Sequence, residues 1–190
     1  MAVPNWNAAG LLPPVDLKDP VSNLRSPYQV SVLDVVHELA TTAERRSIIG
    51  GFLQYRAGLH ALGFTSGFQW VNGSFCTDVE TLEGRPPGDI DVVTFFYSPP
   101  AMSRAERFVL VQDNPQLFVN KIAKDHFRCD AYLVDLSVAT PERVADRAAY
   151  WSSVWGHTRG GVWKGFLQIP LSPELDEHAV EVLNGNEVPA

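Results

Sequence analysis

Two short apolar runs, each joined to polar residues at one end, constrain the fold of this 190-residue chain more than any other feature. The first run, 68–72, ends in Gly73-Ser74, and the second, 89–96, carries Asp89 and Asp91 among β-branched and aromatic residues. Such residues favour strands, and Gly lets a backbone turn tightly or approach another group closely. The sequence therefore predicts two successive buried strands with a Gly-Ser turn after the first and two carboxylates on the second.

Asp89 and Asp91 are the residues in these runs that most need a chemical explanation. Side chains two residues apart on a strand point to the same face, about 7 Å apart along the chain. Two carboxylates on one face of an apolar strand are costly to bury without partners. A divalent cation removes their repulsion, and Mg²⁺ prefers oxygen ligands, commonly one or two carboxylates with water and phosphate. The alternative is a pair of solvated acids at a strand edge. The flanking apolar residues suggest a buried strand, and the Gly73-Ser74 turn ahead of it is what favours the metal site.

The remaining elements are predicted from hydrophobic periodicity and from Pro and Gly positions. Helices are expected over 31–46, 47–62, 104–112, 115–125 and 142–155, and further strands over 127–136 and 162–169. Gly50-Gly51 lies inside the second helix and predicts either a break or a close contact with another helix. The resulting order of elements predicts one α+β domain (a mixed α/β arrangement) over 1–190, with a small mixed β-sheet flanked by helices.

The two ends of the chain are expected to be less regular. Five prolines punctuate residues 1–30, so we predict an extended N-terminal arm rather than a helix. Its apolar residues are expected to pack on the domain: Leu11, Leu12, Val15 and Leu17. A disordered tail is the alternative for this segment. Residues 172–190 are acidic and are predicted to form a loose C-terminal tail.

Composition excludes several classes of function. The formal net charge of −7 argues against binding to extended nucleic acid, which requires a basic surface. The two cysteines have no CxxC spacing, so neither a disulfide framework nor a structural zinc site is expected, and a reducing cytoplasm is the expected location. The N-terminus lacks the features of a signal peptide, and no apolar run is long enough to cross a membrane.

The order of these motifs resembles the polymerase-β-like nucleotidyltransferases, in particular the short, minimal members of that superfamily. In these proteins an apolar strand and a Gly-Ser turn precede an Asp-x-Asp strand, and a later strand carries a third acidic residue. The resemblance lies in residues 70–75 and 88–93, and it covers roughly 45–136 as the catalytic core. The sequences at 69–74, 87–93 and 163–165 are also similar to an uncharacterised bacterial family within the superfamily. The connection between the turn and the Asp pair is somewhat longer than the superfamily pattern.

The resemblance implies a two-metal nucleotidyltransferase that uses Mg²⁺ or Mn²⁺ and an NTP. Asp89 and Asp91 would bridge the metal ions, and a third carboxylate would bind one of them and help to take the acceptor's proton. Within the strand at 127–136, Asp130 suits this role better than Asp135, which lies at the far end and faces the opposite side. Gly73 and Ser74 would hold the β- and γ-phosphates.

Basic residues are expected to complete the triphosphate site. Lys121 and Lys124 are three residues apart on one helix face, so they can act together. The resemblance implies an acceptor hydroxyl on a protein, an RNA or nucleotide, or a small molecule. By family analogy alone, a protein partner in a toxin–antitoxin or phage-defence system is expected. The competing hypothesis is a non-catalytic nucleotide-binding or antitoxin-like module on the same fold.

Overall fold

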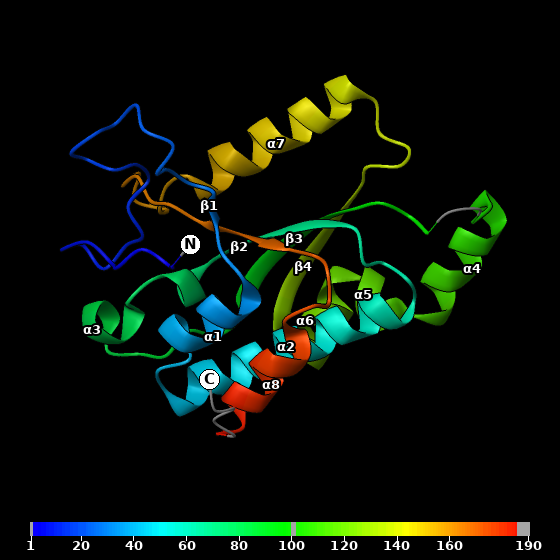
Figure 1. Cartoon of the computed structure of the whole chain (residues 1–190), viewed down its shortest axis with the longest axis horizontal. Helices are drawn as coiled ribbons and strands as arrows, with labels where there is room; N and C mark the ends of the chain where they lie inside the picture. Colours follow the sequence, from blue (N-terminus) through cyan, green and yellow to red (C-terminus); the bar gives the residue numbers. More distant parts are fainter. Residues whose placement is uncertain (1, 100–101, 186–190) are drawn as a thin grey trace.

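The computed structural model describes residues 2–99 and 102–185, and it contains one five-stranded mixed sheet with helices on both faces (Figure 1). The strands are β1 Tyr28–Gln29, β2 Gly67–Asn72, β3 Ile90–Phe96, β4 Cys129–Asp135 and β5 Leu167–Pro170, in the spatial order β1-β5-β2-β3-β4. The helices are α1 Val32–Leu39, α2 Ala43–Ala61, α3 Val79–Glu83, α4 Arg104–Asp113, α5 Pro115–Phe118, α6 Asn120–Phe127, α7 Pro141–Trp155 and α8 Asp176–Leu183, with a short 3-10 helix, η1 Ser74–Cys76. The predicted α+β class and mixed sheet are confirmed.

The centre of the sheet is formed by the two predicted motif strands. β2 pairs antiparallel with β3, and β3 pairs parallel with β4. In this register Asp91 lies opposite Asn72 on one side and opposite Asp130 on the other. Parallel strands need a long crossover connection, and α4, α5 and α6 supply it here. Residues distant in sequence therefore meet on three adjacent strands.

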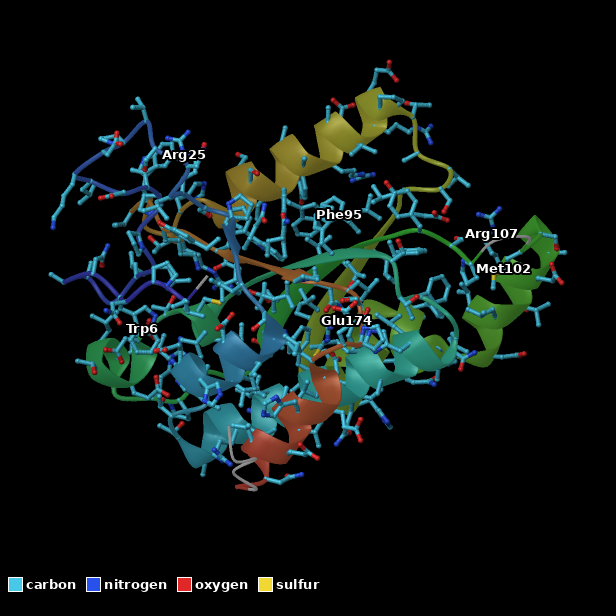
Figure 2. All side chains as sticks on the ribbon, in the orientation of Figure 1. Trp6, Arg25, Phe95, Met102, Arg107 and Glu174 are labelled. Carbon is cyan, nitrogen blue, oxygen red and sulfur yellow. The ribbon has the colours of Figure 1, made fainter. Side chains whose placement is uncertain are left out.

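The alternation of side chains gives the sheet two apolar faces. One face packs against α1, α2, α6 and α8 and forms the larger core, in which Val71, Val92 and Ala131 are buried. The other face packs against α7 through a second, aromatic cluster of Trp70, Val93, Phe95, Val134, Trp151, Trp155 and Phe166. Figure 2 shows the side chain of Phe95 between β3 and α7. Asp91 lies two residues before Val93 on β3, and Asp130 lies four residues before Val134 on β4. Since side chains an even number of residues apart share a face, both aspartates lie on the face of the aromatic cluster.

The first two predicted helices differ from the structure in where one ends and the other begins. Ser31 caps α1 with a capping box, and Thr42 caps α2, so the chain breaks between them at 40–42. α2 then continues through Gly50 and Gly51 without a break. The predicted close helix contact is present instead, because a Cβ atom on Gly51 would lie only 2.1 Å from the carbonyl oxygen of Phe127.

Two other predicted elements are shorter than expected. The helix predicted over 115–125 is divided into α5 and α6 at Val119, whose backbone is extended (φ −107°, ψ 110°). The strand predicted over 162–169 is confined to β5, and residues 156–166 form a loop closed by a bridge between His157 and Trp163. The connection between the Gly-Ser turn and the Asp pair is partly filled by α3.

The predicted N-terminal arm is extended and packs on the domain. Leu11 and Leu12 are buried and Leu11 forms a bridge with Thr77, but the prediction was wrong for Leu17, which is 79% exposed. The arm ends in β1, which pairs parallel with β5 at the edge of the sheet. Two strands from outside the predicted core 45–136, β1 and β5, consequently extend the sheet beyond β2.

The predicted loose tail over 172–190 was wrong for its first part, where α8 forms. α8 packs against α1 and α2: Ala179 is fully buried, and the carboxylate of Asp176 pairs with the buried guanidinium of Arg56 at 2.7 Å. A composition argument based on acidic residues misses this partner, because it lies 120 residues away in the sequence. Residues 186–190 lie outside the described residues. Within the described ranges, no helix is long and apolar enough to cross a membrane.

Candidate metal site

Three carboxylates converge at the end of the sheet where β3 and β4 begin. Asp89 directly precedes β3, Asp91 is its second residue, and Asp130 is the second residue of β4. Each offers an oxygen, and these oxygens all lie within 4.8 Å of one another. The cause is the parallel register, which sets Asp91 beside Asp130 on neighbouring strands with their side chains on one face.

The Gly-Ser turn lies directly beside this triad of Asp89, Asp91 and Asp130. Gly73 has φ +85°, a conformation that favours glycine, and a Cβ atom there would lie 2.4 Å from Oδ2 of Asp91. Ser74 begins η1. The buried Arg45 fixes the segment after it, because its guanidinium donates to the carbonyl oxygens of Phe75 and Thr77. Gly73 is therefore required both by its conformation and by the space that Asp91 occupies.

Helix α6 brings two polar side chains, one turn apart, into contact with the triad. The amide of Asn120 donates to Oδ1 of Asp130 at 2.5 Å and to the carbonyl oxygen of Ala131 at 3.0 Å. The Nζ atom of Lys124 lies 2.5 Å from Oδ2 of Asp89 and 3.4 Å from Oδ2 of Asp130. Lys121 is exposed, and it takes part in no ion pair in the described part of the chain.

The electrostatics of the site are those of crowded carboxylates. Burial, and then the neighbouring charges of Asp89 and Asp130, together raise the pKa of Asp91 to about 6. Hydrogen bonding to Asp89 raises the pKa of Lys124. Lys164, from the loop before β5, lies behind the turn, where its Nζ donates to the carbonyl oxygen of Gly73 at 3.5 Å, and burial lowers its pKa.

The donor set matches what a small divalent cation requires. Three carboxylate oxygens at this spacing supply hard ligands to Mg²⁺ or Mn²⁺ and leave other coordination positions for water or phosphate. A cationic ammonium group, that of Lys124, already lies among two of the three carboxylates. The residues present therefore fit a divalent cation, whose charge would oppose the burial and the carboxylate repulsion that raise the pKa of Asp91.

Most predicted site residues meet at the triad, and the exception is Lys121. Asp89, Asp91, Asp130, Gly73 and Lys124 lie together. Asp135 lies at the opposite end of β4, where it pairs with Arg107 of α4 at 3.4 Å. Ser74 follows Gly73 directly, whereas Lys121 forms no ion pair with the triad.

Sequence reasoning missed Asn120 and did not select Lys164. The partner of Lys124 on the site-facing side of α6 is Asn120, at i−4, rather than Lys121 at i−3. The signal that could have found Asn120 is its spacing from Lys124, since residues four apart share a helix face. Lys164 could not be placed, because a loop rather than a strand carries it.

Aromatic residues line the face of the sheet next to the triad. Tyr132, two residues after Asp130 on β4, is 39% exposed, and its ring lies 4.7 Å from that of Trp151. Burial and then the charge of Asp130 raise the pKa of Tyr132. Trp70, Trp151 and Trp155 are core residues, whereas Trp163 is 75% exposed and Tyr132 is only partly covered.

Comparison with known proteins gives one family match. A search of curated proteins and a search of solved structures each found no match. A family model matches residues 4–170, which include all five strands and every residue of the triad but not α8. The match covers most of the chain, and the chain therefore belongs to a family of unknown function, DUF6932.

Proposed function

We propose that the chain is a metal-dependent nucleotidyltransferase that moves a nucleoside monophosphate from an NTP to a hydroxyl acceptor. The observation that carries the proposal is the meeting of Asp89, Asp91 and Asp130 beside Gly73. The acceptor belongs to one of three classes: a protein side chain, an RNA or nucleotide end, or a small molecule. The net charge of −7 disfavours a long nucleic acid among them.

Each residue of the site has a role in this proposal. Asp89, Asp91 and Asp130 hold Mg²⁺ or Mn²⁺, which when bound stabilises the negative charge of the triphosphate and lowers the pKa of the attacking hydroxyl. Asp130 is the carboxylate that accepts the acceptor's proton. The backbone of Gly73 and the hydroxyl of Ser74 contact the phosphates, because Gly lets the chain approach them without a side chain.

The role of the basic residues follows from their distance to the triad. Lys124 is close enough to meet a phosphate that arrives with the metal, and Lys164 supports the turn from behind through the carbonyl of Gly73. Lys121 is exposed on the same helix and pairs with none of the three carboxylates, so it has no role in the proposed site. A reaction that consumes NTP suits a cytoplasmic protein.

The test is turnover with metal and labelled nucleotide. The protein is incubated with Mg²⁺ or Mn²⁺ and each labelled NTP, with and without cell extract, and pyrophosphate and labelled products are measured. We expect pyrophosphate release that EDTA abolishes. Substitution of Asp89, Asp91 or Asp130 by Ala should reduce the rate by about a hundredfold or more, since each removes a metal ligand.

Asp135→Asn is the matched control, because Asp135 lies on the same strand as Asp130 but at its other end and on the other face. Its rate should remain within about twofold of the parent rate. Equal rates for the parent and for Asp91→Ala would refute the site assignment. Binding of NTP and metal without any turnover would instead favour the non-catalytic nucleotide-binding module.

A further inference from the structure

The ammonium group of Lys124 occupies the position where a cation is needed in the triad. Its Nζ lies 2.5 Å from Oδ2 of Asp89 and 3.4 Å from Oδ2 of Asp130. Both are distances at which an ion pair forms directly. The lysine side chain is 47% exposed, whereas those of the two aspartates are 21% exposed. The lysine thus reaches from the helix surface into the carboxylate cluster.

Asn120 determines which oxygen of Asp130 faces the lysine. Its amide holds Oδ1 and, at the same time, the carbonyl oxygen of Ala131, so one side chain fixes both the carboxylate and the strand. Oδ2 of Asp130 is left for a cation, and Lys124 contacts that atom. Asn120 and Lys124 are four residues apart on α6, so a single helix face supplies both interactions.

The charge balance makes this arrangement informative. Three carboxylates within 4.8 Å repel one another, and one lysine compensates only part of that charge. A divalent cation at the same oxygens interacts with them more strongly than an ammonium group, because it carries twice the charge. The two cations also repel each other at such short range. The lysine and a metal ion therefore cannot share the oxygens that face both of them.

We propose that Lys124 is the resident counter-ion of the metal-free site and that the first divalent metal ion displaces it from Asp89 and Asp130. The inference rests on the proposed function for the metal site, and it adds a regulation of that site. Displacement frees the ammonium group at the edge of the cluster, where it can pair with an anion that arrives with the metal. Metal binding then prepares the phosphate site as well as the carboxylates.

The experiment measures the environment of the lysine and the affinity of the metal separately. Lysines of the full chain are methylated with formaldehyde and cyanoborohydride, with EDTA or with saturating Ca²⁺ or Mg²⁺, and each site is quantified by mass spectrometry. Labelling of Lys124 should increase several-fold with metal. Lys121 is the internal control, because it is exposed on the same helix, and its labelling should not change.

Metal affinity provides the second measurement. By calorimetry, Lys124→Met should bind Mg²⁺ about tenfold more tightly than the parent, since it removes a cation next to the ligands, whereas Lys121→Met should stay within about twofold. Metal binding without release of Lys124, or weaker binding by Lys124→Met, would overturn the inference alone. Release of Lys124 without NTP turnover would keep the inference and overturn the proposed function. Absence of metal binding in both the parent and Lys124→Met would overturn both.

Discussion

At the scale of single residues, the site depends on close contacts between the three carboxylates and their neighbours. Gly73 is in contact with Asp91, and its φ of +85° excludes most side chains. Asn120 holds Asp130, and Lys124 lies between two carboxylates. Small changes at these positions should alter metal binding more than they alter the fold.

Gly73→Ala is expected to weaken metal binding by about tenfold to a hundredfold, because the new methyl group would displace the carboxylate of Asp91. The matched control is Gly84→Ala, since Gly84 has a similar φ of +64° but nothing within 4 Å of a new Cβ atom. Gly84→Ala should lose about 1–2 kcal/mol of stability from left-handed backbone strain. Gly73→Ala should lose more, because its backbone (φ +85°, ψ −162°) lies in a region that essentially only glycine occupies. Calorimetry with Mg²⁺ and thermal unfolding separate the two effects. Equal metal affinities in both variants would contradict the assigned contact.

Asp91 predicts a pH dependence in the metal-free protein. Its pKa of about 6 in the folded state exceeds the unfolded value near 3.9, so the folded state binds more protons between these values. Stability from this group is therefore fully present below about pH 4 and is lost as the pH rises to about 6. In EDTA, the parent should lose about 1–2 kcal/mol more than Asp91→Asn between pH 4 and 7, measured by urea unfolding.

Metal affinity should have the opposite pH dependence, because the ligand must be deprotonated. Binding of Mg²⁺ to the parent should weaken about fivefold between pH 6 and 5 and change little above pH 7. Calorimetry at these pH values measures the affinity for Mg²⁺.

The stability prediction has its own contradicting outcome. If the unfolding free energy of the parent and of Asp91→Asn changed with pH by the same slope, Asp91 would not be the responsible group.

The carboxylates, Gly73 and Lys124 were predicted from the sequence, whereas Asn120 and Lys164 were not selected. Asp89 and Asp91 stand out because charges are rare in a strand of β-branched residues. The prediction of Asp130 required a later strand beside that of Asp89 and Asp91, and the resemblance to the superfamily implied such a strand. Asn120 and Lys164 have ordinary local sequence contexts, and only tertiary structure brings them to Asp130 and Gly73.

At the scale of elements, the position of the triad depends on how α6 packs. α6 precedes β4 directly, and its last residue, Phe127, presents its carbonyl oxygen to α2 at Gly51. Arg128 then turns the chain with φ +58° and donates to the carbonyl oxygen of Gly88, next to Asp89. The contact between α2 and α6 thus fixes both sides of the site.

Gly51→Ala should destabilise the protein by about 1–3 kcal/mol, because its methyl group would overlap the carbonyl oxygen of Phe127. The adjacent residue gives a matched control. A methyl group on Gly50 would meet only Leu183 at 3.7 Å, an ordinary contact, so Gly50→Ala should gain up to about 1 kcal/mol from helix propensity. Urea unfolding of both variants measures the difference. Stabilisation of both by the same amount would exclude the close helix contact.

Elements with strong local signals were predicted well, and those that depend on distant partners were not. β2, β3 and β4 follow from runs of apolar residues, and the caps of α1 and α2 explain where the predicted boundary failed. β1 has only two residues and exists because β5 lies beside it. The break between α5 and α6 at Val119 could not be predicted, because no Pro or Gly lies at that position.

At the scale of the whole molecule, two buried arginines connect segments that are far apart in the chain. Arg45 joins α2 to the segment after the Gly-Ser turn through Glu80 at 2.7 Å. Arg56 joins α2 to α8 through Asp176 and also donates to Gln69 of β2 at 2.6 Å. Both guanidinium groups are fully buried, so they need these partners.

Asp176→Ala should cost about 3–5 kcal/mol, because it leaves the buried charge of Arg56 without its carboxylate. Glu177→Ala is the control, since Glu177 lies in the same first turn of α8 but is exposed. Its cost should be below about 1 kcal/mol. Metal affinity should be unchanged in both variants, because α8 lies on the sheet face away from the triad. A small loss of stability for Asp176→Ala would mean that α8 contributes little to the fold.

The aromatic cluster beneath α7 also gives the protein an optical probe of its own site. Trp151 and Trp155 lie with their ring centroids 5.1 Å apart, and the carbonyl oxygen of Trp155 accepts a hydrogen bond from Asn72, the residue opposite Asp91. Tyr132 connects Trp151 to the strand of Asp130. A nucleotide that carries an N-methylanthraniloyl group and binds at the triad would therefore quench the emission of these indoles by energy transfer. Ligands could then be screened by fluorescence without labelling the chain.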